Sequence, residues 1–330
     1  MESFTGKLAV VTGGGSGMGR ELARQLPAAG CSVASCDWHP EAVAQTAATA
    51  RAGAAGGAAV TAHACDVSDE AQVERFGDEL LAAHARDHVD LVFCNAGIGG
   101  GASFVRDSRE EWGRTFAVDW QGVYYCARVF LPLLIESGDG VLVNTSSVGG
   151  FWATGGPGMP NTAYPAAKFA VRGFTEALIE DLRTSAPQVR AVVVLPGHVG
   201  TDILANSLRA HGLPEPGQKS DAQVEGLIPP GARAGLIRAG LLAASPSAGD
   251  LRRTLARLTA DFRDKAPLSA AAAAAVILDG VRSGAWRILV GEDARRLDAA
   301  VRARPHAAYD YTELFSTAPH PPARDPGAGR

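Results

Sequence analysis

The sequence has no apolar run long enough to cross a membrane. Its longest apolar run, residues 268–278, is mostly alanine, whereas a spanning helix needs about 20 apolar residues. The first residues, MESFTGKLAVV, lack the basic stretch and apolar segment of a signal peptide. The sequence therefore predicts no membrane partner and a cytoplasmic location.

Cysteine is scarce, and its spacing suits neither disulfides nor metal. The 330 residues include 5 cysteines, with no CxxC pair and no even framework. Cys36 and Cys94 stand in apolar, strand-like runs, where small buried thiols are expected. The histidines show no metal-ligand spacing with cysteine or carboxylate residues, so no metal site is predicted.

An excess of charge of one sign is also missing. The net charge is -4, and Lys and Arg are scattered along the chain. This argues against nucleic acid or an anionic membrane surface as the main partner. Apolar residues make up 46% and charged residues 20%, as is ordinary for a globular protein. A chain of this length can form one large α/β domain or two smaller ones.

Short β-like runs alternate with longer helical patterns up to residue 196. The expected strands are residues 7–12, 32–37, 60–66, 90–95, 141–146 and 190–196. The expected helices are residues 20–29, 40–51, 70–84, 110–136 and 166–184. Runs such as RAVVVLP and DLVFCN are apolar without alternation, which is typical of strands covered on both faces. This order predicts an α/β fold, a doubly wound, Rossmann-like parallel sheet of about seven strands with helices on both faces.

The pattern loosens after residue 196. Residues 197–265 are rich in Gly and Pro, and we expect them to form a substrate-side insertion with a weak helix over 201–211. An alanine-rich helix over 268–282 and a last strand over 287–291 follow. Residues 1–316 are expected to form a single domain. The tail, residues 317–330, is rich in Pro and Gly with nothing to bury, which predicts disorder.

A glycine-rich loop directly follows the first expected strand. In TGGGSGMG, Gly13, Gly17 and Gly19 are spaced as TGxxxGxG, and a helix is expected from Met18. Glycines permit a tight turn and let the backbone approach a pyrophosphate, which then lies at the positive helix N-terminus. A flexible loop is the alternative, but the strand before it and the helix after it favour a dinucleotide site.

Asp37 ends the second expected strand, where it can select the nucleotide. A carboxylate at this point can accept hydrogen bonds from both ribose hydroxyls of the adenosine half. It would repel a 2′-phosphate, and neither the glycine loop nor the residues directly after Asp37 include Arg or Lys. The alternative is a turn-forming aspartate. The sequence therefore predicts NAD rather than NADP as the cofactor.

Six motifs together make the sequence similar to a known family. They are TGGGSGMG, CDV at 65–67, NAG at 95–97, VNTSS at 143–147, YPAAK at 164–168 and PGHVGTD at 196–202. In this order, and mostly at the usual spacing, they resemble the short-chain dehydrogenase/reductase family over residues 5–202. The resemblance implies a catalytic domain that uses NAD(P) and acts on CH–OH groups.

The resemblance also implies a catalytic group. Tyr164 would be the general acid/base that exchanges a proton with the substrate oxygen, and Ser147 would hydrogen-bond that oxygen. Lys168, one helical turn after Tyr164, would stabilise the phenolate and bind the nicotinamide ribose. A free phenol has a pKa of about 10, so work near neutral pH needs such stabilisation.

The same motifs imply the contacts of the cofactor. In motif order they are Gly13, Ser16, Gly17, Met18, Gly19, Asp37, Asp66, Val67, Asn95, Ala96, Gly97, Tyr164, Lys168, Pro196, Gly197, Val199 and Thr201. Asp66 and Val67 would contact the adenine. The backbone of Val199 and the hydroxyl of Thr201 would hold the nicotinamide carboxamide, and so fix the ring face that exchanges hydride.

Asp119 departs from the pattern of the family. In FAVDWQGVYY it stands where members commonly have an asparagine that keeps a water between the lysine and solvent. An aspartate can accept a hydrogen bond but cannot donate one, and its charge would pair with Lys168. We therefore expect Asp119 to serve catalysis in a retained but altered proton relay.

The gap between Ser147 and Tyr164 is longer than is usual in the family. Phe151, Trp152 and Met159 make it apolar, which predicts a wall of the substrate pocket. A surface or subunit-contact loop is the alternative. Together with apolar residues of the insertion, this gap indicates an apolar alcohol or ketone.

Three functions are open at this point. The first is an NAD-dependent oxidoreductase that interconverts a secondary alcohol and a ketone. An NADPH-linked carbonyl reductase is the second, and Asp37 disfavours it. A catalytically silent nucleotide-binding regulator is the third, which the intact Ser147, Tyr164 and Lys168 disfavour. The expected partner is a small-molecule alcohol or ketone, and the resemblance implies a homodimer or homotetramer.

Overall fold

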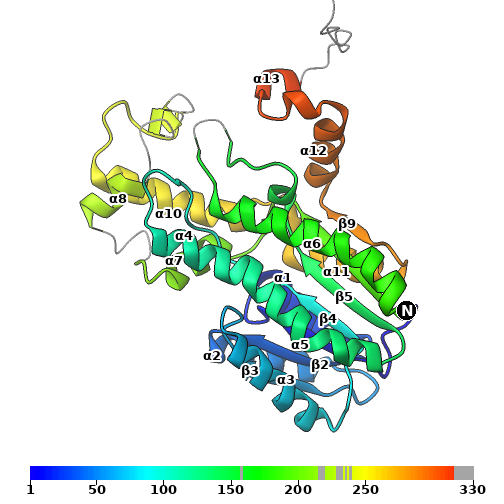
Figure 1. The fold of residues 1–330 in the computed structure, drawn as a ribbon. Helices are drawn as coiled ribbons and strands as arrows, with labels where there is room; N and C mark the ends of the chain where they lie inside the picture. Colours follow the sequence, from blue (N-terminus) through cyan, green and yellow to red (C-terminus); the bar gives the residue numbers. More distant parts are fainter. Residues whose placement is uncertain (157–158, 215–219, 228–232, 235, 238–239, 316–330) are drawn as a thin grey trace, which may run out of the picture.

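Seven parallel strands form the central sheet of this computed structural model, which describes residues 1–156, 159–214, 220–227, 233–234, 236–237 and 240–315. The strand order is β3-β2-β1-β4-β5-β6-β9 (Figure 1). The bounds are β1 Leu8–Thr12, β2 Ser32–Asp37, β3 Val60–Ala64, β4 Leu91–Cys94, β5 Gly140–Thr145, β6 Val189–Pro196 and β9 Arg287–Val290. The predicted doubly wound sheet is confirmed. The tail predicted to be disordered, 317–330, lies outside the described residues.

Helices cover both faces of this sheet. One face carries α1 (Gly17–Ala28), α2 (Pro40–Ala52) and α11 (Ala270–Arg282), and the other carries α3 (Glu70–His84), α5 (Gly122–Glu136) and α6 (Ala163–Ser185). Ala9 and Val11 of β1 belong to the first core, and Leu8 and Val10 belong to the second. Because alternate residues of a strand point to opposite faces, double coverage requires the uninterrupted apolar runs seen in the sequence.

The direction of chain winding reverses between β1 and β4. β1 pairs with β2 on one side and with β4 on the other. The hydroxyl of Thr12, at the end of β1, accepts hydrogen bonds from the N–H groups of Asn95 and Ala96 at 3.0 and 3.1 Å. The glycine loop and the NAG motif are thereby held together at the carboxyl ends of the two strands. In parallel sheets this reversal point opens the crevice where ligands bind.

The helix predicted over 110–136 is not one α-helix. It divides into α4 (Arg109–Phe116), a π-helical turn η1 (Ala117–Gln121) and α5. Asp119 lies in the π-helical turn and is fully buried, where its carboxylate contacts Lys168 and the N–H of Ile98. A π turn adds one residue to the helical register and is common at functional sites. The hydrogen-bond geometry of a π turn is poorer than that of an α-helix, and the contacts of Asp119 offset this cost.

The predicted insertion over 197–265 is more helical than its composition indicates. Its elements are β7 (Val199–Gly200), which pairs with β8 (Leu268–Ser269), and α7 (Ile203–Ala210), α8 (Asp221–Leu227) and α10 (Ala248–Asp264). The weak helix expected over 201–211 corresponds to α7. The long helix α10 is not among the predicted elements, although Ser247 and Asp250 form a capping box at its start, which is a readable sequence signal.

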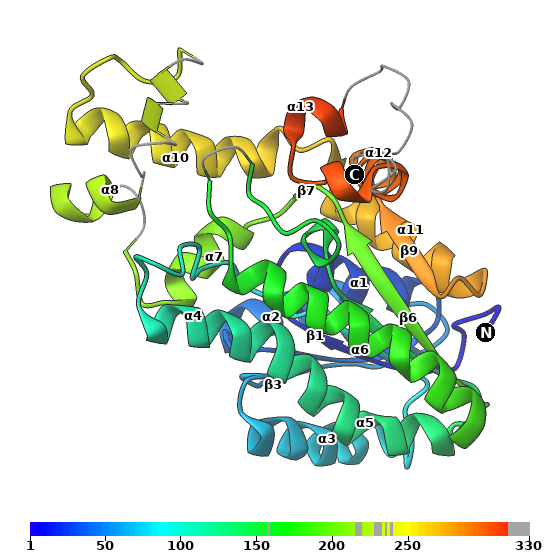
Figure 2. The ribbon, with the colours of Figure 1, turned by 45° about the horizontal axis from the view of Figure 1, so that its top comes forward.

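After β9 the chain forms α12 (Glu292–Ala303), the 3-10 turn η4 (Pro305–Ala307) and α13 (Tyr311–Leu314). Figure 2 shows α12 and α13 together at the end of the sheet toward which β6 points. Leu297 and Val301 of α12 pack with Phe151, Val193 and Leu195. Among the helices that the structure describes, none combines the length and apolar character that a membrane span requires.

Candidate active site

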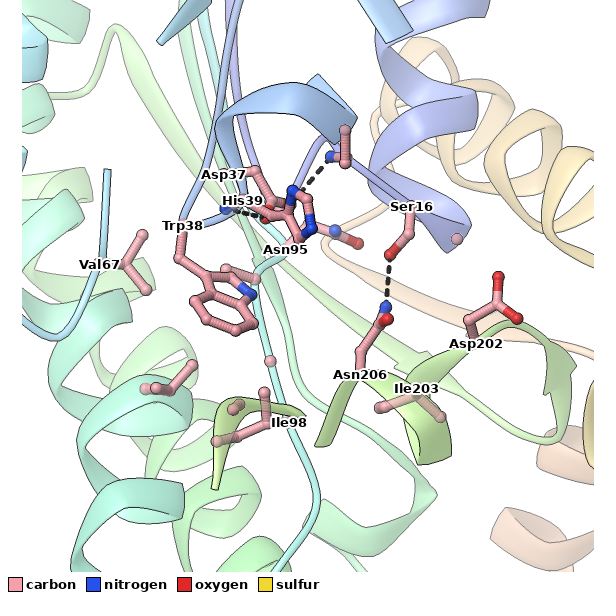
Figure 3. A pocket seen from close by; sticks show the side chains of 18 of the residues that line it. Ser16, Asp37, Trp38, His39, Val67, Asn95, Ile98, Asp202, Ile203 and Asn206 are labelled. Carbon is pink, nitrogen blue, oxygen red and sulfur yellow. Dashed lines mark hydrogen bonds between the residues drawn. The ribbon is translucent and has the colours of Figure 1, made fainter. Parts of the chain in front are cut away.

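A cavity of about 300 Å³ lies at the carboxyl ends of β1, β2 and β4 (Figure 3). Most of the predicted cofactor residues line it, namely Gly13, Ser16, Gly17, Met18, Asp37, Asp66, Val67, Asn95, Ala96, Gly97 and Thr201. The predicted residues outside its lining are Gly19, Tyr164, Lys168, Pro196, Gly197 and Val199. The structure thus brings most of the predicted cofactor residues together in one cavity, and Tyr164 and Lys168 lie outside its lining.

The glycine loop is compact because it excludes side chains. Gly13 and Gly17 adopt φ angles of +69° and +53°, which glycine tolerates best. A Cβ on Gly19 would overlap the carbonyl oxygen of Gly13, so this third glycine packs α1 against the turn. The N-terminus of α1, at Gly17 and Met18, faces the cavity. Its unpaired N–H groups and positive dipole suit an anionic pyrophosphate.

Asp37 stands at one end of the cavity. Its Oδ2 accepts a hydrogen bond from the N–H of Gly15 at 2.9 Å, and its Oδ1 accepts one from the N–H of His39 at 3.0 Å (Figure 3). Burial raises the pKa of Asp37, and these two donors oppose the rise. The Trp38 ring lines the cavity next to it. A carboxylate that can accept hydrogen bonds from ribose hydroxyls and a flat aromatic ring therefore both line this end of the cavity.

Three arginines that the sequence analysis did not assign also line the cavity: Arg20, Arg114 and Arg209. Arg20 directly follows the glycine loop, and this position is the sequence signal that points to it. Arg114 of α4 donates to Oδ2 of Asp66 at 2.8 Å. Burial alone would raise the pKa of Asp66, but hydrogen bonds from Ser68 and Arg114 lower it.

Polar side chains of α7, and of His211 directly after it, join the insertion to the loops that line the cavity. Asn206 donates from Nδ2 to Oγ of Ser16 at 2.8 Å, as Figure 3 shows. The N–H of Gly99 donates to Oγ of Ser207 at 2.7 Å, and Nε2 of His211 lies 2.8 Å from the Gly99 carbonyl oxygen. No local sequence pattern shows which loops the polar residues of this helix meet.

A buried ion pair lies directly behind the cavity wall. Nζ of Lys168 lies 2.9 Å from Oδ1 of Asp119 and donates to the carbonyl oxygen of Thr145 at 3.2 Å. A Cβ on Gly97, which lines the cavity, would lie 2.6 Å from Oδ1 of Asp119 and 3.2 Å from Nζ of Lys168. Only glycine leaves room at this point, so the ion pair is in contact with the wall of the nucleotide cavity.

Tyr164 lies between this ion pair and Ser147. The helix α6 begins at Ala163, so Tyr164 and Pro165 stand in its first turn, where proline leaves no helical hydrogen bond unmade. Nζ of Lys168 is 5.5 Å from the centre of the Tyr164 ring. A Cβ on Gly149 would lie 3.3 Å from the Tyr164 ring and 3.5 Å from Oγ of Ser147, so the phenol ring and this hydroxyl are neighbours. The two residues of YPAAK therefore lie on one side of α6, as their spacing predicts.

Burial and charge set the protonation of this cluster. Burial raises the pKa of Tyr164; Lys168 lowers it and the charge of Asp119 raises it further. Burial alone would lower the pKa of Lys168, but the carboxylate of Asp119 raises it above its ordinary value. The ammonium therefore stays charged and is held by a carboxylate.

The gap between Ser147 and Tyr164 contacts the C-terminal elements. Phe151 and Trp152 pack in one apolar cluster with α12, and neither lines the nucleotide cavity. Met159 is 50% exposed. Residues 157–158 of this gap lie outside the described residues. Phe151 and Trp152 therefore pack against the C-terminal elements, and the wall of a substrate pocket stays a prediction.

These residues fit a dinucleotide. A carboxylate stands at the adenosine end, a helix N-terminus at the middle, and Tyr164 with Lys168 behind Gly97. Oδ1 of Asn95 is buried without a hydrogen-bond partner in the part of the chain that the structure describes, so it can accept one from a bound ligand. Among those residues, no cluster of His, Cys, Asp and Glu could hold a metal ion.

Comparison with known proteins agrees with this geometry. The family model described as short chain dehydrogenase matches residues 7–211. The oxidoreductase SadH of Mycobacterium tuberculosis is 38% identical over 212 residues, which cover 64% of this chain and 74% of the relative. Meso-2,3-butanediol dehydrogenase of Serratia marcescens is 36% identical over 200 residues, with 61% and 74% covered.

A solved structure matches almost the whole chain. The crystal structure of a short-chain dehydrogenase/reductase from Burkholderia phymatum in complex with NAD has a TM-score of 0.73 and 30% sequence identity. The match covers 97% of this chain and 99% of that one, so it includes the insertion and the C-terminal elements. The protein thus belongs to the short-chain dehydrogenase/reductase family, whose members use a nucleotide cofactor and act on CH–OH groups of small molecules.

Proposed function

We propose that the protein is an NAD-dependent oxidoreductase that interconverts a secondary alcohol and a ketone. The observation that carries this proposal is the cluster of Ser147, Tyr164 and Lys168, in which Ser147 and Lys168 are buried, Tyr164 is half-buried, and Lys168 lies directly behind Gly97 of the cavity wall. A phenol, an ammonium and a hydroxyl are the groups that hydride transfer at a carbonyl carbon needs around it. A relative that is named for meso-2,3-butanediol, a secondary alcohol, supports the substrate class.

Each residue of the cluster has one role in this proposal. Bound NAD supplies the ring that accepts or donates hydride. Tyr164 takes the hydroxyl proton of the alcohol in oxidation and returns it in reduction. Ser147 donates a hydrogen bond to the same oxygen and stabilises its developing charge. Lys168 stabilises the phenolate, and Asp119 holds Lys168, so that the relay behind Tyr164 contains a carboxylate.

The preference for NAD rests on Asp37. Solved members of the family hold NAD in one case and NADP in another, so the choice depends on the residues of this chain. The Asp37 carboxylate is fixed by Gly15 and His39, where it would repel a 2′-phosphate. Arg20 is the observation that favours the alternative, an NADPH-linked carbonyl reductase, because it lines the cavity beside the glycine loop.

An apolar substrate is part of the proposal. Ile98, Val118 and Ile203 line the cavity beyond the glycine loop, and Leu204 of α7 is partly exposed. An apolar alcohol or ketone would gain contact area on such side chains. A single catalytic domain over 1–316, a cytoplasmic location and a homodimer or homotetramer stay predictions from the sequence.

Two measurements test this function. Calorimetric titration with NAD and NADP gives the coenzyme preference, and nicotinamide absorbance with a panel of apolar secondary alcohols gives turnover. We expect Tyr164→Phe to abolish turnover while the dissociation constant of NAD stays within about twofold, because the phenol acts on the substrate proton. Coenzyme binding without turnover in the wild-type protein would instead indicate the silent regulator.

A further inference from the structure

We propose that the C-terminal segment, residues 292–315, is a positioning element of the active site that holds two of its loops. Through Asp293 it holds the loop that starts with Pro196 and Gly197. Through the main chain at Ala308 it holds the segment that follows Ser147. The segment lies beyond residues 7–211, to which the family model is matched. The inference rests on the proposed function, because that function gives the two loops their roles.

Asp293 is attached to the first loop by a short hydrogen bond. Its Oδ2 accepts from the N–H of His198 at 2.6 Å, although 95 residues separate the two in the chain. A Cβ at Gly197 would overlap the same carboxylate, so the carboxylate packs directly against the backbone of this glycine. Oδ1 of Asp293 is buried without a partner in the part of the chain that the structure describes.

The loop held by Asp293 leads straight to the predicted nicotinamide contacts. The N–H of Gly197 donates to the carbonyl oxygen of Val290 at 2.9 Å, and Nε2 of His198 lies 2.7 Å from the carbonyl oxygen of Phe262. Val199 then enters the two-stranded sheet with β8. Loss of the Asp293 contact would free the backbone immediately before the residues that would hold the carboxamide.

Trp152 attaches the second loop to the same segment. Its Nε1–H donates to the carbonyl oxygen of Ala308 at 2.5 Å, and its ring meets that of Phe315 edge to face, with centres 6.3 Å apart. The N–H of Ala153 donates to the hydroxyl of Tyr309 at 3.4 Å. Trp152 follows Ser147 by only one short 3-10 turn. The position of the serine hydroxyl therefore depends on where this tryptophan is docked.

The segment itself is firmly attached to the sheet. Arg287 of β9 forms a two-pronged ion pair with Asp298 of α12, at 3.0 and 2.5 Å, and Arg302 contacts the same carboxylate. Asp298 is only 8% exposed, and planar two-pronged pairs of this kind restrict geometry as well as adding energy. A fixed α12 can transmit its position to both loops.

Binding of a ligand with nicotinamide and of one without it distinguishes a misplaced nicotinamide loop from a general loss of structure. For Asp293→Ala we expect the dissociation constant of NAD to rise about tenfold, the size of one lost charge-assisted hydrogen bond. That of ADP-ribose, which lacks the nicotinamide, should not change in the same calorimetric titrations. Asp293→Asn keeps an acceptor oxygen and should restore most of the NAD affinity. Glu292→Ala, in the same helical turn, is the matched control.

This role would be overturned if Asp293→Ala raised the dissociation constants of NAD and ADP-ribose by the same factor, or if it changed neither. Wild-type protein that binds neither ligand would contradict the proposed function and this role together. If the wild-type protein binds both ligands and Asp293→Ala leaves the ratio of their dissociation constants unchanged, only the role of Asp293 is contradicted.

A second pair of variants tests the serine side. Trp152→Phe keeps the ring against Phe315 and removes the donor to Ala308. We expect kcat/KM for the alcohol to fall roughly 3- to 10-fold, with NAD affinity unchanged and faster hydrogen exchange over residues 148–156. Trp286→Phe, at the 48% exposed Trp286, is the control and should change none of these. Unchanged exchange over 148–156 in Trp152→Phe would contradict the docking role.

Discussion

The ammonium of Lys168 lies 2.9 Å from Oδ1 of Asp119, and the two side chains are only 3% and 0% exposed. The second carboxylate oxygen of Asp119 is buried without a partner in the part of the chain that the structure describes. Other polar groups approach the pair: the carbonyl oxygen of Thr145, the phenol of Tyr164, the N–H of Ile98 and, at longer range, the imidazole of His211. A charged group thus stands where the family commonly has a neutral amide.

This ion pair predicts the pH dependence of Asp119→Asn. The negative charge of Asp119 raises the pKa of Tyr164, because it disfavours the phenolate. A neutral amide removes that effect, so the phenolate forms at lower pH. We expect the midpoint of the pH profile of kcat/KM for alcohol oxidation to move to lower pH. The exchange of exposed Asp279 for Asn is the control, and an unchanged or raised midpoint in Asp119→Asn would contradict the altered relay.

The place of Asp37 predicts a change of coenzyme in Asp37→Ser. Removal of the carboxylate eliminates its repulsion of a 2′-phosphate and leaves Arg20 at the same cavity. We expect the ratio of kcat/KM for NADP to that for NAD to rise at least about tenfold, the effect of one charged contact. The ratio is measured with a single alcohol at saturation. An unchanged ratio would mean that Asp37 serves only to hold Gly15 and His39.

Two helical glycines predict opposite outcomes for the same substitution. In Gly19→Ala the new Cβ would overlap the carbonyl oxygen of Gly13, whereas at Gly113 it would meet nothing within 4 Å. Alanine normally stabilises a helix by about 0.5–1 kcal/mol relative to glycine, so Gly113→Ala should raise the thermal midpoint. Gly19→Ala should weaken NAD binding at least about tenfold, because the loop must move. Retained affinity in Gly19→Ala would refute the close packing described for α1.

The Asp66–Arg114 pair predicts a pH-dependent contribution to stability. The folded protein lowers the pKa of Asp66, so its carboxylate stabilises the fold above the unfolded pKa of about 3.9 and loses this effect as pH falls through the folded value. With both side chains partly exposed, Asp66→Asn should reduce the free energy of unfolding by about 1 kcal/mol at pH 7. The difference should vanish in strong acid. Denaturant titrations with exposed Asp78→Asn as control measure it, and a difference independent of pH would contradict the assignment.

Local patterns foretold much of the fold and part of the site. The uninterrupted apolar runs of the strands and the glycines before α1 predicted a parallel sheet with a nucleotide crevice, and both are present. The four-residue spacing of Tyr164 and Lys168 likewise placed both on one side of α6. The π-helical turn at Asp119 was not foreseen, because the contacts of Asp119, with Lys168 and Ile98, come from other elements of the chain. Nor was α10, whose capping box lay in a segment rich in Gly and Pro.

The sequence by itself determined those features that depend on neighbours along the chain: strand and helix order, the turn at Gly13, and the relation of Tyr164 to Lys168. Only the tertiary structure decided which distant groups meet. The contact of Trp152 with Ala308 joins residues 156 positions apart, and that of His198 with Asp293 joins residues 95 apart. The physical reason is that periodicity and backbone preference act within a few residues. Contacts between residues of distant elements form only when those elements pack against one another.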